Sequence, residues 1–148
     1  MKVRRRSGFP LAAIYALALA GIASCSDSSG PKVPAEVGEY QLALVNAGGL
    51  PAIVFSSPAG RITINNATMT LREDKSYREV RNYTTTYATG QIVTSSESED
   101  GQYSVVGSQI TFSIPETQQL AGLSFTGALE KGVVEYTFDG IAYRYQKP

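Results

Sequence analysis

The strongest constraint on the fold is an alternation of apolar and polar side chains on both sides of Asp139-Gly140. If this pair forms a two-residue turn, apolar side chains meet across the strands, namely Phe138 with Ile141, Tyr136 with Tyr143, and Val134 with Tyr145. These side chains share one face, and the opposite charges of Glu135 and Arg144 meet on the other. Because a shift of one residue would mix the two faces, the pattern predicts an antiparallel hairpin.

Tight turns at Lys131-Gly132 and Gly107-Ser108 give the same result. The cross-strand pairs that they predict are again apolar: Leu129 with Val134, Phe125 with Phe138, Val105 with Ile110, and Tyr103 with Phe112. The turn at Lys131-Gly132 also sets Gly127 opposite Tyr136, where the missing side chain leaves room for the ring. Consistent pairing at each turn indicates an antiparallel meander in the C-terminal half.

The N-terminal half of the body is less regular. Alternating apolar residues predict a strand at residues 38–46, and further runs follow at 50–55 and 61–64. The parity of the pattern changes between Ile64 and Met69, which predicts a turn or bulge at Asn65-Asn66.

Two loops are also expected in this region. Glu73-Asp74-Lys75 would form a three-residue loop that pairs Leu71 with Tyr77, with Lys75 at a position where Gly is preferred. The polar stretch at residues 87–100 is expected to form a long or mobile loop.

The fold class follows from these patterns. After the first 25 residues no window has the sustained 3.6-residue apolar period of a helix. Short alternating runs separated by Gly, Asp, Asn and Pro predict an all-β fold, an antiparallel up-and-down meander barrel of about 8–10 short strands. Closure into a barrel also removes the edge strands that a long open meander would expose.

The N-terminus has the features of a secretory signal: a basic start without acidic residues, then an apolar run at residues 11–23. As a helix this run spans about 20 Å, short of the ~30 Å hydrocarbon core of a membrane. It ends in Ile22-Ala23-Ser24-Cys25, which resembles the lipobox of bacterial lipoproteins. The resemblance implies lipidation of the Cys25 sulfur and cleavage before it; an ordinary signal peptide with a nearby Cys is the alternative.

The chain therefore divides into three predicted parts: a signal peptide at 1–24, the lipidated Cys25 with a flexible tether at 25–36, and a barrel domain at 37–148. Cleavage removes four of the 13 Lys and Arg residues and none of the 13 Asp and Glu residues, so the mature chain carries a net charge of about −4. We expect no nucleic-acid partner, and membrane contact through the lipid alone. The expected location is the bacterial cell envelope, and Ser26 after the Cys favours the outer membrane, on its periplasmic or surface face.

The composition excludes several kinds of site. The chain has no His and one Cys, which rules out a His general base, a Cys/His zinc site and an intrachain disulfide. No Gly-x-Ser-x-Gly, Ser-x-x-Lys or phosphate-binding glycine motif occurs. The carboxylates at residues 97–100 lack the spacing of a Ca²⁺ loop and indicate a solvated acidic loop. We expect no catalysis, cofactor or metal, with an enzyme that uses paired carboxylates as a third hypothesis.

Over residues 38–147 the chain resembles the small lipocalin-like domains, calycin-type β-barrels, found behind lipoboxes in bacteria. The resemblance rests on Gly38-Glu39-Tyr40-Gln41-Leu42, the hairpin from Met69 to Tyr77, Gly101-Gln102-Tyr103-Ser104-Val105, and Tyr143-Arg144-Tyr145. Lipocalins carry Gly-x-Trp in the first strand and a late Arg packed near that Trp. Here Gly38 and Tyr40 match with Tyr in place of Trp, and Arg144 is the candidate Arg. The resemblance implies a barrel with one open end that can hold a small apolar molecule.

The candidate ligand-binding residues are aromatic and charged side chains expected on the inner face: Tyr40, Tyr77, Glu79, Arg81, Tyr103, Tyr136 and Tyr143. An eight-stranded barrel of about 110 residues can also be filled by such side chains, so most of them are equally explained as core. Alternation from Tyr77 to Tyr83 turns Glu79 and Arg81 inward, whereas a bulge after Tyr77 would turn Val80 inward and both charges outward.

These observations lead to two hypotheses for function. The first is a membrane-anchored, non-catalytic lipocalin-like lipoprotein that binds a small hydrophobic ligand. The alternative is a structural or interaction protein of the cell envelope whose barrel core is filled. The volume left inside the barrel distinguishes the two.

Overall fold

The structure, a computed structural model, describes residues 33–115 and 122–148. Within these ranges the chain forms strands and no helix. The strands are β1 (Gly38–Val45), β2 (Ala52–Ser57), β3 (Gly60–Leu71), β4 (Ser76–Tyr87), β5 (Ile92–Val106), β6 (Gln109–Ile114), β7 (Leu123–Glu130), β8 (Val133–Phe138) and β9 (Ile141–Gln146). No helix in this part of the chain is long and apolar enough to cross a membrane.

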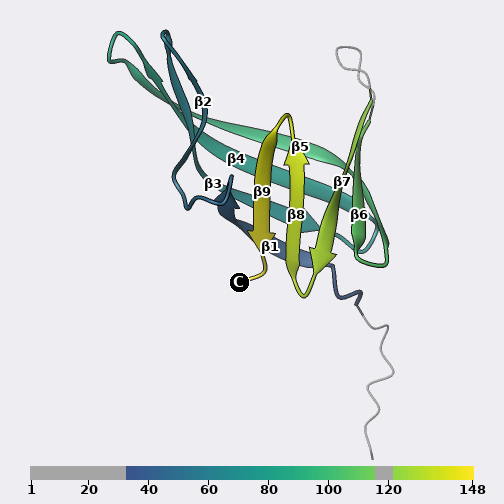
Figure 1. The fold of residues 1–148 in the computed structure, drawn as a ribbon. Helices are drawn as coiled ribbons and strands as arrows, with labels where there is room; N and C mark the ends of the chain where they lie inside the picture. The colour runs from purple at the N-terminus through teal and green to yellow at the C-terminus, as the bar shows by residue number, and fades with distance from the viewer. Residues whose placement is uncertain (1–32, 116–121) are drawn as a thin grey trace, which may run out of the picture. The chain divides into compact units, whose positions relative to one another are not determined.

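Neighbouring strands pair in sequence order, except that β1 closes the sheet by pairing with both β9 and β3. All strands but β2 therefore form a closed, antiparallel, up-and-down ring of eight (Figure 1). β2 lies outside the ring and pairs with the first half of β3. The predicted all-β meander barrel is confirmed.

The three predicted tight turns have the predicted register. Tyr136 pairs with Tyr143 across Asp139-Gly140, and Val105 pairs with Ile110 across Gly107-Ser108. Leu129 pairs with Val134 across Lys131-Gly132. Both residues of the first and third turns have positive φ angles, between 48° and 78°, as the hairpin turns that match strand twist require.

The irregular features of the N-terminal half are also confirmed. The pairing of β3 with β4 shifts between Ile64 and Asn66, which is the predicted bulge, and β3 runs through it as one strand. Leu71 pairs with Tyr77 across the predicted three-residue loop. Lys75 takes the left-handed conformation there, with a φ of 66°.

The prediction of a long loop at residues 87–100 is wrong. β4 continues to Tyr87, and β5 starts at Ile92 and pairs with it over its whole first part. This hairpin extends past the ring, so both of its faces meet solvent and neither needs an apolar stripe. Thr, Val and Ile favour extended backbone even where no apolar alternation marks a strand.

The body of the barrel is filled with side chains. The largest fully buried residues include Tyr40, Tyr77, Tyr145, Phe112, Ile64, Met69, Leu71 and Ile110. The Phe112 ring contacts Tyr77 edge-on at 5.0 Å between centroids and stacks on Phe125 at 5.1 Å. Burial of such rings supplies much of the stability of a small β domain, so most of the predicted inner face is core.

The N-terminal residues before β1 are fixed to one end of the barrel, which we call the closed end. Lys147 Nζ donates to the carbonyl oxygens of Ala35 (2.6 Å) and Val37 (2.8 Å). Lys75 Nζ lies 2.8 Å from a carboxylate oxygen of Glu36. Ala35 and Glu36, the last residues of the predicted tether, therefore lie against the barrel.

The assignment of Arg144 as the cation near the first-strand aromatic residue is wrong. Arg144 lies on the outer face, where its guanidinium is 3.1 Å from the Glu135 carboxylate. Lys147 takes the expected position, with its ammonium 5.2 Å from the centre of the Tyr40 ring. Alternation along β9 turns Tyr143 and Tyr145 inward, so the residue between them must point outward.

Candidate binding site at the open end of the barrel

The part of the chain that the structure describes leaves the end of the barrel opposite residues 35–37 open, and we call this end the mouth. It is bordered by the turn between β8 and β9, by the ends of β6 and β7, and by the part of β2–β5 that extends past the ring (Figure 1). β6 pairs with β5 only from Gln102 onward, so residues 92–101 of β5 have no neighbour strand on that side within the described chain. The mouth therefore opens between β5 and the β6–β7 pair.

Two hollows occupy the mouth, of about 390 Å³ and 340 Å³, and both are lined by Glu97. The first is bordered by charged residues and by apolar side chains at the rim, among them Glu79, Arg81, Glu99, Leu123 and Phe138. The second is largely apolar and aromatic, with Val54, Phe55, Ile62, Tyr83, Ile141 and Tyr143. Together they present an apolar wall beside a charged wall.

The floor of the mouth is a buried polar network around Glu79, whose exposed fraction is 0%. Arg81 donates to both carboxylate oxygens of Glu79, through Nε at 2.7 Å and Nη2 at 2.6 Å. The Tyr136 hydroxyl donates at 3.0 Å, and the Tyr145 hydroxyl also donates to Glu79. Such pairing compensates for the removal of a carboxylate from water.

Burial and charge shift the pKa values of this network. Desolvation, with the negative charge of Glu79 adding to it, raises the pKa of Tyr136 and of Tyr145 above the usual value. Burial alone would lower the pKa of the Arg81 guanidinium, but its hydrogen bonds to Glu79 and the charge of that carboxylate raise the pKa instead. The tyrosines stay protonated as donors, and Arg81 stays cationic.

The structure decides between the two orientations of Glu79 and Arg81. β4 pairs with both neighbours without a shift from Tyr77 to Asn82, and the extra residue of the bulge that follows lies on β3, so the two charges point inward with the tyrosines. The alternative, with Val80 inward and both charges outward, is wrong. An ion pair with two hydroxyl donors makes the inward arrangement tolerable.

Two further carboxylates line the inner face. Glu99 lies directly across from Glu79, and Glu97 directly across from Arg81. The Tyr77 hydroxyl donates to Glu99 at 2.7 Å, and Glu99 is half-buried. The predicted acidic loop is thus a strand, and alternation sends Asp100 to the other face, 3.7 Å from Arg78. Among the described residues no group of three acidic or Cys side chains could hold a metal ion.

The predicted site residues fall into two groups. Glu79, Arg81, Tyr136 and Tyr143 lie at or under the mouth, whereas Tyr40 and Tyr103 are buried toward the closed end and Tyr77 lies in the filled body. Sequence reasoning missed mouth residues on β3, β5 and β9, such as Ile62, Glu97, Glu99 and Ile141. Extending the alternation of β4 across to β5 would have found the two carboxylates.

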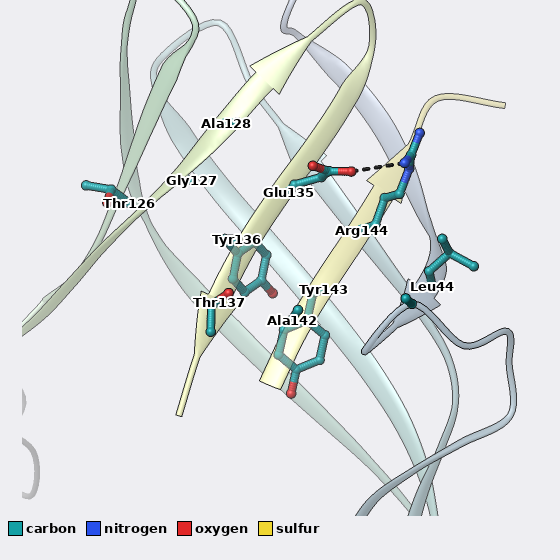
Figure 2. Close-up of a pocket in the computed structure, with 11 residues that line it drawn as sticks. Leu44, Thr126, Gly127, Ala128, Glu135, Tyr136, Thr137, Ala142, Tyr143 and Arg144 are labelled. Atoms are coloured by element: carbon teal, nitrogen blue, oxygen red, sulfur yellow. Dashed lines mark ion pairs between the residues drawn. The ribbon is translucent and has the colours of Figure 1, made fainter. Parts of the chain in front are cut away.

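A third hollow, of about 550 Å³, lies on the outer face of β7, β8 and β9. Figure 2 shows the Glu135–Arg144 ion pair beside it, with the small side chains of Thr126, Ala128 and Ala142 around it. It is larger than either hollow of the mouth, but the charged groups that line it are exposed and already paired with each other. The mouth is therefore the better candidate site.

Comparison with known proteins does not identify a relative: no protein-family model matches the chain, and no curated protein matches it.

Proposed function

We propose that this chain is a membrane-anchored, non-catalytic binding protein that takes a small, largely apolar ligand at the mouth of its barrel. The observation that carries the proposal is the pair of adjoining hollows above a filled core, about 390 Å³ and 340 Å³ in volume. Small-molecule sites are typically concave, mostly apolar and supplied with a few fixed polar groups.

The chemistry of the floor supports binding rather than catalysis. Both oxygens of Glu79 are engaged by Arg81 and tyrosine hydroxyls, so this carboxylate is not free to exchange a proton with a substrate. The polar network fixes the floor, and the aromatic and aliphatic wall supplies the contact area.

The membrane anchor rests on the lipobox-like segment at Cys25. A lipid there would hold the domain at the bacterial cell envelope, with the outer membrane as the expected site. Replacement by Cys25→Ser should abolish incorporation of labelled fatty acid and release the protein into the soluble fraction. Unchanged labelling of the variant would contradict the anchor.

A structural or interaction protein of the envelope is the second candidate. The filled body of the barrel favours it, because the large side chains of Tyr40, Tyr77, Phe112 and Tyr145 are fully buried there. In that case the exposed side chains of the extension, such as Ile53 and Phe55, would contact a partner.

Titration with the neutral fluorescent probe N-phenyl-1-naphthylamine tests the binding proposal. We expect saturable binding that weakens in Phe138→Ala, which lines the mouth, and is unchanged in Val106→Ala, which is exposed near the closed end. Absence of saturable binding would favour the structural alternative. If both variants lost the same affinity for the probe, the probe would bind at a place other than the mouth.

A further inference from the structure

We propose that the ligand of the mouth carries a positive charge beside its apolar body, as a protonated amine or a quaternary ammonium group does. This inference rests on the proposed binding function and names the chemical class of the ligand. It follows from which charges at the mouth already have a partner and which do not.

Among the described residues, the first hollow is lined by Arg81 and by the carboxylates of Glu79, Glu97, Glu99 and Asp100, and Asp139 lines the second hollow. Arg81 is committed to Glu79 by two hydrogen bonds of 2.7 Å and 2.6 Å. Within residues 33–115 and 122–148, neither Glu97 nor Glu99 forms an ion pair. The inner face of β5 therefore brings two negative charges to the mouth that a ligand could neutralise.

The position of these two carboxylates makes the excess charge relevant to binding. Glu97 is exposed and lines both hollows, and Glu99 is half-buried beside Tyr77. Asp100, on the opposite face of the same strand, has Arg78 as its partner. A half-buried carboxylate such as Glu99 attracts a cation more strongly than a carboxylate in open water.

Aromatic rings provide the second half of a cation site. Tyr83 and Tyr143 line one hollow and Phe138 lines the other, on both sides of Glu97. The Arg81 guanidinium already lies over the Tyr143 ring, 5.7 Å from its centre, so a ring at the mouth does accept a cation on its face. Aromatic faces together with carboxylates are the surroundings that bind organic ammonium groups.

An anionic ligand does not fit this arrangement. The cation at the mouth that could bind a carboxylate or phosphate is Arg81, and its charge is balanced by Glu79 at 2.6 Å. An anion would also approach Glu97 and Glu99, which repel it. A neutral ligand would gain no electrostatic attraction from either carboxylate.

Calorimetric titration of the mature chain with three ligands that share a ten-carbon chain tests the inference. We expect decyltrimethylammonium to bind about tenfold more tightly than decanol, and decanoate to bind most weakly. Raising the salt concentration should weaken the binding of the ammonium compound and leave that of decanol unchanged.

The variants Glu97→Gln and Glu97→Gln/Glu99→Gln should lose most of the preference for the cation and keep their affinity for decanol. Glu39→Gln, on an exposed position of β1 at the closed end, is the matched control and should bind like the parent chain. The Glu97 side chain makes no hydrogen bond within the described residues, so the single variant leaves the polar network of the floor intact.

The outcomes separate this inference from the binding proposal. Equal affinity for the three ligands, tighter binding of decanoate, or an unchanged preference in the variants would overturn the cationic ligand while leaving a binding site. If none of the three ligands bound, both proposals would fail.

Discussion

Replacing Arg81 with Met should markedly lower the free energy of unfolding of the domain. The substitution removes the cation from Glu79, which is 0% exposed, while the Arg81 side chain itself is 13% exposed. Breaking a buried ion pair from one side costs about 3–5 kcal/mol, because the remaining charge stays buried without compensation. The hydroxyl of Tyr136, 3.0 Å from Glu79, still donates, so we expect a value near the lower limit, about 3 kcal/mol.

A double-mutant cycle separates the ion pair from the loss of packing. Glu79→Gln/Arg81→Met removes both charges, so its cost should be smaller than the sum of the two single substitutions, with a coupling energy of about 2 kcal/mol. Urea unfolding followed by tyrosine fluorescence and far-ultraviolet circular dichroism measures all four proteins, since the chain has no Trp. At typical urea slopes the midpoint of Arg81→Met should fall by about 2 M.

The reasoning is refuted if Arg81→Met costs less than about 1 kcal/mol, which is the value of an exposed pair. It is equally refuted if the costs of the single substitutions simply add. Either result would mean that Glu79 reaches water in solution and does not depend on its partner.

Other expected outcomes concern single side chains. Tyr145→Phe removes a hydroxyl donor from the buried Glu79 carboxylate and should cost about 1.5–3 kcal/mol in the free energy of unfolding, measured in urea; a loss below 0.5 kcal/mol would show that water replaces the hydroxyl. Burial raises the pKa of Tyr40 to about 12. Since an unfolded Tyr titrates near 10, the native state keeps its proton longer, and this stability is complete below about pH 10 and lost as the pH rises toward 12. Between pH 10 and 12 the free energy of unfolding should therefore fall less steeply in Tyr40→Phe than in the parent chain, and equal slopes would contradict this. Gly127→Ala should cost roughly 1–3 kcal/mol, because the added Cβ would lie 2.9 Å from the Cβ of Tyr136 and still closer to the facing backbone; an unchanged thermal midpoint would rule out this close approach.

The register of the barrel was predictable because each turn fixes several cross-strand pairs at once, and a wrong alignment would put charged and apolar side chains on the same face. At Asp139-Gly140 an incorrect alignment would have placed Glu135 among aromatic residues, and no such conflict arises in the observed pairing. The bulge was predictable in the same way, because the apolar alternation changes parity at Asn65-Asn66, where the pairing of β3 with β4 shifts. Alternation of apolar and polar residues therefore specifies the register of a strand wherever one of its faces is buried.

The mouth was less predictable because this alternation is lost where a strand is exposed on both faces. Residues 92–100 form part of a strand that extends past the ring, where neither face must be apolar, so no alternation identifies them. The inward direction of Glu79 and Arg81 depends on donors from β8 and β9, more than 50 residues away in the sequence. No local pattern in β4 shows that Tyr136 and Tyr145 will be there.

The attachment of residues 35–37 to the closed end fixes the beginning of the described chain on the side of the barrel away from the mouth. Neither these residues nor Lys75 and Lys147, which hold them, line either hollow of the mouth. Changes to this attachment would therefore act on the stability of the barrel and leave the surface that a ligand meets unchanged.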